Sequence, residues 1–369
     1  MSYYLSNGLR YVRPYYHKYV ANAKLRWFDR TCYDVYCSEF RNQPPEHHYA
    51  KIVHGQMKLV KNPNSRNHHV VYEGEDLLEK VRIGPGDKIV HFEHVHEPPV
   101  LDGVPEIIHE DDQYVVVDKP AGIPVHPVKN YFYNTVLQLV YQMRPDLEPL
   151  YPVHRLDRLT SGVLMFGKDR ESASRFKRLM KEKKGVEKIY LARVSGDFPM
   201  ETCSCDDPIV YIYGSRREVK QFDPARTVFT KVFYDPEKDE SVLKCRPISG
   251  FPHQIRIHLR NLGYPIVRDT LYRHKYTRVF TDRAQVTDEY LSEMYDRSMR
   301  ERESVADDRK CEQCQTTLYR DPDPQTMSIR LHSLSYSLAD GETEWKFETA
   351  VPAWAGSELT DVPHSEPPK

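Results

Sequence analysis

Long apolar stretches are absent from this sequence of 369 residues, and no uninterrupted run approaches the roughly 20 apolar residues that cross a bilayer. Residues 1–20 are polar and aromatic, and they lack the apolar core of a secretory signal peptide. Charge of one sign is not in excess either. The net charge is −1, so any attraction to nucleic acid must come from local patches. These absences predict a soluble, intracellular protein with no membrane partner. We expect the cytoplasm, with the nucleus and the mitochondrion left open.

Cysteine is scarce, with seven residues in the chain, and this odd number predicts a reducing compartment rather than a disulfide framework. Cys311 and Cys314 have zinc-knuckle spacing, and Cys203 with Cys205 could complete four ligands. Only the first pair has good spacing, and it lies in a charged segment, so we assign no metal site. We expect surface positions for the paired histidines, which lack a carboxylate constellation: His47, His48, His68, His69, His94 and His96.

Hydrophobic residues make up 39% of the chain and charged residues 29%, which allows a core for two domains. Residues 1–37 form a basic and aromatic arm. Up to about residue 30 the arm carries six tyrosines and six Arg or Lys against the single acid Asp29. Interleaved basic and aromatic side chains suit contact with a nucleic-acid backbone and stacking on bases. The alternative is an apron that packs on the body of the protein.

Residues 38–105 have the pattern of a small separate module. A polar helix is expected at 44–54, then Gly55, short strands at 57–60 and 70–72, and a strand that follows the Gly86-Asp87 turn. This order is similar to the S4-type RNA-binding fold. A proline-marked junction follows, and we place the boundary near residue 105.

In residues 106–355, several expected strands follow one another directly and few helices lie between them. This order predicts an α+β domain on a mainly antiparallel sheet. A charged insert covers about 273–325, and a polar, proline-rich tail at 356–369 is expected to be disordered. The expected strands span 114–118, 162–167, 188–195, 208–213, 227–234, 241–246, 328–337 and 344–350, and the expected helices span 134–144, 171–184 and 253–262.

The segment HRLDRLTSG (154–162) places Asp157 in a polar loop that leads directly into the buried strand GVLMFG. Arg155 and Arg158 flank this aspartate, and neighbouring cations lower a carboxyl pKa by about 1–3 units. A carboxylate that stays ionised favours a nucleophile over a general acid. The alternative for this segment alone is an ordinary turn with ion pairs.

Five segments in a fixed order carry a more specific signal: DDQYVVVDKPAGIPVHP (111–127), HRLDRLTSG (154–162), KIYLARVSG (188–196), RPISGFPHQIRIHLRNLGYPI (246–266) and LHSLSY (331–336). Together they resemble the motifs of the RluA-type RNA pseudouridine synthases. The first region also looks like the N-terminal segment of the eukaryotic, tRNA-modifying branch of that family. The resemblance implies a cofactor-independent isomerase that converts uridine to pseudouridine in structured RNA, with tRNA as the first expectation for its partner.

The resemblance also assigns roles to individual residues. It implies that Asp157 is the nucleophile, that Tyr190 stacks on the extruded uracil and helps to remove its C5 proton, and that Arg256 pairs with Asp157. Arg155 matches an arginine near the target base. Leu259 or Ile257 would supply an apolar wall beneath the ring, and the alternative for both is simple core packing.

RNA contacts are expected from side chains around this loop and from one helix. His154 and Arg158 flank the nucleophile in sequence. The helix at 171–184 has a basic face that could contact phosphates, although a solvated face is the alternative. Its basic residues are Arg175, Lys177, Arg178, Lys181, Lys183 and Lys184.

Two departures from the family pattern bear on function. The family commonly has Gly-Arg-Thr-His-Gln where this chain has Gly250-Phe251-Pro252-His253-Gln254. This difference puts in doubt either the docking of the RNA backbone or the support of this loop. Arg268-Asp269 stands where the family often has Gly-Asp. The first departure supports an alternative function, a catalytically weak RNA-binding or RNA-chaperone protein that retains the fold.

Overall fold

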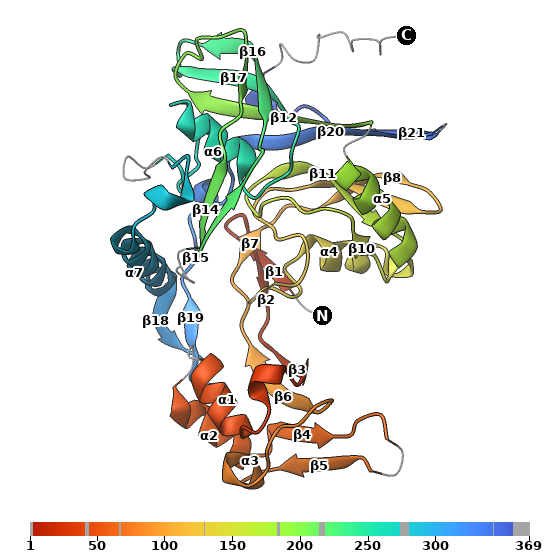
Figure 1. Cartoon of the computed structure of the whole chain (residues 1–369), viewed down its shortest axis with the longest axis vertical. Coiled ribbons are helices and arrows are strands. Elements are labelled where there is room, and N and C mark those ends of the chain that lie inside the picture. Colours follow the sequence, from red (N-terminus) through yellow and green to blue (C-terminus); the bar gives the residue numbers. More distant parts are fainter. Residues whose placement is uncertain are drawn as a thin grey trace. The chain divides into compact units, whose positions relative to one another are not determined.

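The computed structural model describes residues 3–40, 44–65, 68–128, 130–182, 185–213, 218–273, 280–341 and 343–356. The chain divides into two compact units (Figure 1). The smaller unit comprises residues 13–96 and 311–315, and the larger unit comprises residues 1–12, 97–310 and 316–369. No helix within the described ranges is long and apolar enough to cross a membrane.

The smaller unit is a four-stranded antiparallel sheet with helices packed on it. Its strands, in sheet order, are β3 (Tyr15–Asn22), β6 (Lys88–Val95), β4 (Met57–Lys61) and β5 (Val70–Glu73). The helices are α1 (Cys32–Glu39), α2 (Pro45–Val53) and α3 (Asp76–Glu79). Thr31 caps α1, since its side chain accepts a hydrogen bond from Asp34 N at 3.1 Å. Trp27, Ile52 and Leu59 are among the residues of its separate core.

The helix and strands expected between residues 44 and 90 are present as α2, β4, β5 and β6. The similarity of this unit to the S4-type fold stays a prediction. The division of the chain differs from the expected one in two ways. Residues 15–22 of the expected arm form β3 of the small sheet, and the boundary lies between His96 and Glu97 rather than near residue 105.

The larger unit contains a ten-stranded mixed sheet. In sheet order the main path is β13 (Thr202–Cys205), β16 (Thr227–Asp235), β17 (Glu240–Pro247), β12 (Val186–Ser195), β20 (Leu331–Asp340), β11 (Ser161–Gly167), β9 (Tyr114–Lys119) and β8 (Glu106–Glu110). Two further strands, β10 (Tyr151–Pro152) and β21 (Thr343–Glu348), pair with β11 and β20. Within the described residues only the β11–β20 pair is parallel, so the α+β, mainly antiparallel prediction is confirmed.

Three helices accompany this sheet: α4 (Val136–Met143), α5 (Arg170–Glu182) and α6 (Gln254–Asn261). Figure 1 shows α4 and α5 near β11, whereas α6 lies by the end of the sheet formed by β16 and β17. Phe176 of α5 is buried in the main core, together with the strand residues Val116, Leu164 and Leu243. A small sheet of β1 (Tyr3–Ser6), β2 (Leu9–Val12) and β7 (Val100–Leu101) also belongs to this unit.

The expected charged insert contains regular structure that the sequence did not predict. It includes α7 (Asp288–Ser304) and the hairpin β18 (Ala306–Lys310) and β19 (Thr317–Tyr319). Tyr290 of α7 packs with Phe280 and Val210, and Val210 lies in the hairpin β14 (Ile209–Tyr213) and β15 (Glu218–Phe222). Short 3₁₀ helices are η1 (Leu25–Trp27), η2 (Pro145–Leu147), η4 (Arg283–Gln285), η5 (Pro324–Thr326) and η6 (Ala353–Ala355). The tail predicted to be disordered lies, from residue 357 on, outside the described residues.

Candidate active site

Asp157 lies in the loop that joins β10 to β11. The fully buried Lys119, at the end of β9, fixes this loop through its Nζ atom. Nζ donates hydrogen bonds to the main-chain carbonyls of Thr160 at 2.7 Å, Pro120 at 2.9 Å and Arg158 at 3.2 Å. Three acceptors match the three donors of the protonated amine, and burial lowers the pKa of Lys119 to about 7. The Lys119 side chain therefore holds the loop that carries Asp157 in place.

Gly162 defines the other end of this loop. Its φ is 108°, and a Cβ atom there would lie 2.1 Å from the carbonyl oxygen of Ser333. Only glycine permits this approach, because any other residue would collide with the backbone of β20. Gly162 and Ser333 are partners in the parallel pairing of β11 and β20. The glycine that ends HRLDRLTSG thus allows β20 to pack directly beside the loop that carries Asp157.

Arg256, in the first turns of α6, connects two aspartates. Its Nη1 donates to Asp157 Oδ2 at 2.8 Å. Its Nε and Nη2 form a fork with Asp269, at 2.6 Å and 2.9 Å. The Arg256 side chain is 4% exposed and that of Asp269 is 0% exposed, whereas that of Asp157 is 25% exposed. Asp269 therefore fixes the guanidinium, and the guanidinium orients the partly exposed carboxylate.

The pKa of Asp157 follows from these neighbours. Burial alone would raise it, but the adjacent His253 ring and the Arg256 guanidinium offset burial and hold the pKa below its usual value. Burial lowers the pKa of His253 to about 4, although Asp157 opposes this shift. The imidazole is therefore neutral at pH 7, and Arg256 supplies the positive charge. Asp157 is a carboxylate under these conditions.

His253 forms a second contact to the nucleophile. It precedes α6 with a φ of 55°, in the left-handed region. Its Nδ1 lies 2.8 Å from the Tyr272 hydroxyl, and its Nε2 lies 3.6 Å from Asp157 Oδ1. A carboxylate only accepts hydrogen bonds, so the favoured tautomer has the proton on Nε2 and accepts from Tyr272. Asp157 is thus flanked by a cation on one oxygen and a neutral donor near the other.

Two tyrosines from adjacent strands lie on the opposite side of the loop. The hydroxyl of Tyr190 on β12 is 2.8 Å from that of Tyr336 on β20. The ring of His154 stacks on Tyr336, with 4.7 Å between centroids and 16° between planes. Burial raises the pKa of Tyr190, so its phenol is protonated at neutral pH. These rings give the site flat apolar faces.

The carboxylate, its guanidinium partner and the aromatic rings meet at one cavity of about 310 Å³, whereas Lys119 and Asp269 support it from outside its lining. This volume is at the lower end of the range of about 300–1,000 Å³ that small-ligand sites occupy. Asp157, Tyr190 and Arg256 line it, as the sequence predicted. The other lining residues are His154, Arg155, Leu156, Thr160, Met180, Lys188, Pro247, Ser249, Gly250, Phe251, His253, Gln254, Ile255, Leu331 and Tyr336.

A larger cavity of about 680 Å³ contains none of the three predicted residues of the reaction site. Arg193, which lines it, is paired with Asp235 and with Glu240, the latter at 2.6 Å. The predicted reaction residues line the smaller cavity instead, so the candidate site is placed there.

The expected RNA contacts divide into several groups. His154 and Arg155 line the cavity, and Arg155 is exposed. Arg158 is half-buried and does not line it. The expectation for Leu259 is wrong, because this residue is 0% exposed within the main core and cannot form a wall of the cavity. Ile257 is also core.

Ile255, one helical turn before Leu259, contributes the apolar lining from α6.

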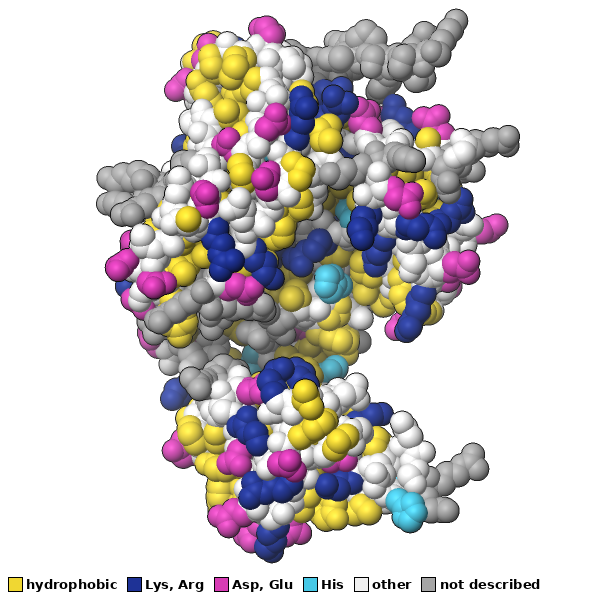
Figure 2. Space-filling view, viewed as in Figure 1, with side chains coloured by type: hydrophobic (Ala, Val, Ile, Leu, Met, Phe, Trp, Pro, Cys, Tyr) yellow, Lys and Arg dark blue, Asp and Glu magenta, His cyan; other side chains and the backbone are white. Residues whose placement is uncertain are grey.

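The basic face of α5 borders the cavity. Met180 of this helix lines the cavity, while Lys177 and Arg178 are exposed. Figure 2 shows Lys and Arg side chains gathered over the region of α5. Arg175 is half-buried, with its guanidinium 5.6 Å from the centre of the Trp345 ring. Lys183 and Lys184 lie outside the described residues.

The Phe251-Pro252 departure does not leave its loop without support. The buried Gln254 side chain accepts hydrogen bonds from Ser249 Oγ at 2.8 Å and Phe251 N at 3.1 Å. Its amide group donates to Arg226 O and Thr227 Oγ1, both at 2.9 Å. The ring of Phe251 also stacks on another phenylalanine at 5.1 Å. The loop is thus supported by Gln254, which the family pattern shares, and by the stacked ring of Phe251.

The Arg268-Asp269 departure has a backbone explanation. Arg268 has a φ of 66°, in the region that glycine adopts without a steric penalty. The common glycine of the family therefore suits this position, and the arginine adopts it at a cost of about 1 kcal/mol. Asp269, which the turn delivers to Arg256, is unchanged.

Four residues that complete the site were not predicted as members: Lys119, His253, Asp269 and Tyr336. Each lies within or just after one of the five motifs, so the motifs themselves were the available signal. Their contacts include separations of 13 residues, for Asp269 with Arg256, and of 146 residues, for Tyr336 with Tyr190, and no local pattern specifies such pairs.

Comparison with known proteins identifies the family of the chain. A family model described as RNA pseudouridylate synthase matches residues 113–261. The chain is 38% identical over 274 residues to human "Pseudouridylate synthase RPUSD2", covering 73% of this chain and 47% of that protein. The chain thus spans about half the length of this relative.

Two relatives from Saccharomyces cerevisiae match over most of the chain. "tRNA pseudouridine(32) synthase, mitochondrial" is 32% identical, with 95% of this chain and 78% of the relative covered. "tRNA pseudouridine(31) synthase" is 30% identical, with 95% of this chain and 96% of the relative covered. The chain therefore belongs to the RNA pseudouridine synthases, a family of isomerases that act on RNA.

Proposed function

We propose that this protein isomerises a uridine of tRNA to pseudouridine, with Asp157 as the nucleophile. The observation that carries the proposal is the Asp157 carboxylate, 2.8 Å from Arg256, in a cavity that Tyr190 also lines. The reaction is an isomerisation, so no atom is gained or lost by the RNA overall.

The arrangement suggests how the carboxylate would act. Oδ2 of Asp157 accepts from Arg256, which leaves Oδ1 as the oxygen available for attack. Oδ1 would form a bond to C1′ of the ribose or to C6 of the uracil, and the bond between N1 and C1′ would break. The uracil would rotate, C5 would bond to C1′ and the bond to Oδ1 would break, while the C5 proton would pass to water and N1 would take a proton from water. Asp157 is released unchanged at the end.

The aromatic side chains support capture of a single extruded base. Removing a base from its stack costs a few kcal/mol, and stacking on aromatic rings returns about 1–3 kcal/mol per base. Tyr190 and its partner Tyr336 offer such faces beside Asp157. Because the raised pKa keeps Tyr190 protonated, stacking is a better role for its ring than removal of the C5 proton by a phenolate.

Phosphate contacts would come from the surroundings of the cavity. Arg155 is exposed at its edge, and Lys177 and Arg178 extend from α5, the helix whose Met180 lines it. Recognition of RNA through an extruded base favours loops, in which bases can leave the stack. Two relatives are named for tRNA positions 31 and 32, so we place the target uridine at or near these positions of tRNA.

The test is tritium release from tRNA transcripts labelled at uridine C5, with no cofactor added. The wild type should release tritium and Asp157→Asn should not, while both bind the tRNA with similar affinity. Asp112→Asn is the matched control, because Asp112 is an exposed aspartate in another motif and should leave the rate unchanged.

Equal release by wild type and Asp157→Asn would refute the role of this carboxylate. Binding without release from any tRNA by the wild type would instead favour the RNA-chaperone alternative.

A further inference from the structure

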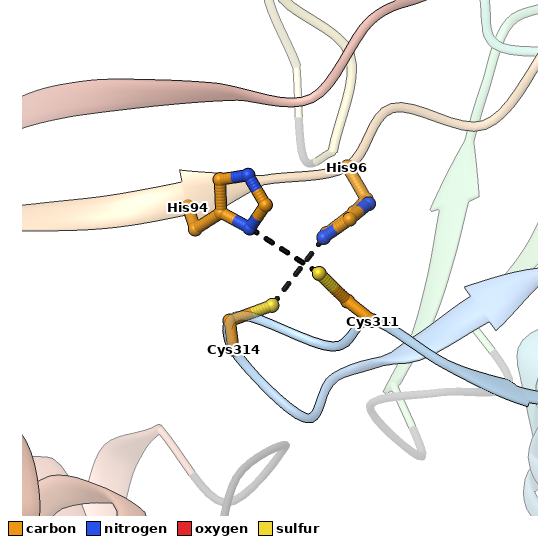
Figure 3. A group of neighbouring side chains, drawn as sticks. All are labelled: His94, His96, Cys311 and Cys314. Carbon is orange, nitrogen blue, oxygen red and sulfur yellow. Dashed lines mark hydrogen bonds between the residues drawn. The ribbon is translucent and has the colours of Figure 1, made fainter.

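The smaller unit contains a cluster of four side chains that the reaction does not use. His94 lies near the end of β6 and His96 just after it, while Cys311 and Cys314 lie in the loop between β18 and β19. Figure 3 shows the four side chains directed toward one another. We propose that these residues form a tetrahedral site for a zinc ion.

The distances within the cluster fit such an ion. His96 Nε2 lies 3.3 Å from Cys314 Sγ, and Cys311 Sγ lies 3.5 Å from His94 Nδ1. Zinc bonds of about 2.3 Å to sulfur and about 2.0–2.1 Å to nitrogen imply a tetrahedral edge of about 3.6 Å between an S and an N ligand. All four donor atoms lie within 4.8 Å of one another. Coordination would thus require small side-chain shifts and no refolding.

The chemistry of the donors selects the metal. Two imidazoles and two thiols form a set of nitrogen and sulfur ligands, which is typical of zinc. Calcium and magnesium prefer oxygen, and this group includes no carboxylate. Four protein ligands fill a tetrahedral coordination sphere, so the site would be structural and would leave no position for a substrate.

The backbone conformation positions both pairs of ligands. Residues two apart on a strand point to the same face, so the β6 register directs His94 and His96 to one side. The rings lie 4.8 Å apart. In the other pair, Gln315 N donates to Cys311 O at 2.9 Å and closes a tight turn around the two cysteines. The turn holds both thiols near the histidines, and all four ligands are partly buried.

The pairing corrects two expectations from the sequence. His94 and His96 are not isolated surface histidines, since each contacts a cysteine. Cys203 and Cys205 lie on β13 and are not members of the group around Cys311. Each histidine is 217 or 218 residues from the cysteine that it contacts, which explains why spacing alone did not reveal the site.

A zinc ion here would stabilise the smaller unit. It would fix a loop that reaches the unit from a distant part of the sequence, and binding to the folded arrangement would shift the equilibrium toward that fold. This role is independent of the proposed reaction and is tested without measuring activity.

The test is the metal content of the full-length protein, purified without chelator and measured by inductively coupled plasma mass spectrometry. The wild type should contain about one zinc per chain, and the variant Cys311→Ser/Cys314→Ser should contain less than a tenth of that. The matched control is Cys203→Ser/Cys205→Ser, which removes the other closely spaced cysteine pair and should keep its zinc. Equal zinc in the two double variants, or none in the wild type after incubation with zinc and dialysis, would overturn the proposal.

A second measurement uses the wild-type chain, in case the variant does not fold. Alkylation of cysteines is followed by peptide mass spectrometry, with bound zinc and after treatment with a chelator. Cys311 and Cys314 should react at least tenfold faster once zinc is removed. Cys37 and Cys203, which have similar partial exposure, should react at the same rate in both conditions. Uniform rates at all four positions, or a Cys311–Cys314 disulfide in the freshly purified protein, would contradict a zinc site.

Discussion

Arg256→Gln removes a cation that the partly exposed Asp157 and the buried Asp269 share. In the wild type the guanidinium bonds to Asp157 at 2.8 Å and to Asp269 at 2.6 and 2.9 Å. Glutamine is too short and too weak a donor to replace this fork, so Asp269, which is 0% exposed, loses its cation and keeps only the main-chain N–H groups of Leu271 and Tyr272 as partners. Breaking a buried pair by removal of one partner costs about 3–5 kcal/mol. We expect a loss of this size in the free energy of unfolding at pH 7.

The loss should depend on pH, and its sign follows from Asp157. In the wild type the pKa of Asp157 is below its usual value, so the pairing stabilises the fold above about pH 4 and is lost at lower pH. Without Arg256, His253 and Arg155 still oppose the effect of burial, but the pKa of Asp157 should rise from its wild-type value. The stabilisation from this carboxylate should therefore shrink, and the stability difference between wild type and variant should grow as the pH rises through the pKa of Asp157 in the variant. Each unit of pKa change corresponds to about 1.4 kcal/mol.

Urea unfolding followed by fluorescence at pH 5.5 and pH 8 measures both effects. Arg144→Gln is the matched control, since Arg144 also bridges two carboxylates, Glu110 and Asp146, but is 41% exposed. It should cost less than about 1 kcal/mol. The double variant Arg256→Gln/Asp269→Asn should be more stable than Arg256→Gln, because the unpaired charge is gone. Equal costs at the two arginines, with no gain in the double variant, would refute the reasoning.

Two further predictions concern residues that support the site. Lys119→Met removes the donor for three main-chain carbonyls, and unsatisfied buried groups cost about 1–3 kcal/mol each. The single-turnover rate of tritium release should therefore fall at least tenfold, while tRNA affinity stays within about twofold. A wild-type rate would show that the loop of Asp157 does not need this anchor. Arg268→Gly relieves a φ of 66° and should raise the unfolding free energy by about 1 kcal/mol, measured by urea titration. A decrease would mean that contacts of the arginine side chain outweigh its backbone strain.

The elements of the larger unit were predictable because the sequence has clear local patterns there. The strand expected at 114–118 is β9, and the helix expected at 134–144 is α4. The sequence predicted only that the insert is charged. Helix α7 was not predicted, because its sequence is mostly polar and only a few of its residues, such as Tyr290, pack inward. Local periodicity detects amphipathic elements and fails for helices with little apolar surface.

The site shows a similar limit. The motifs predicted Asp157 and Arg256, 99 residues apart, through their resemblance to a family rather than through any local rule. On α6, Ile255 and Leu259 are four residues apart and share a face, yet only the first reaches the cavity. Depth along a helix depends on how the helix docks, which a sequence pattern does not state. The contacts of Lys119 with three main-chain carbonyls also depend on how segments pack, so the sequence does not predict them.

The division of the chain has a practical consequence for exchanging parts between relatives. The backbone passes from one unit to the other after residues 12, 96, 310 and 315. A swap of the first hundred residues would therefore also replace β1 and β2, which form one sheet with β7. It would also leave the new residues 13–96 with a 311–315 loop from the other protein. A faithful transplant of the smaller unit must carry two segments, residues 13–96 and 311–315, and leave residues 1–12 with the recipient.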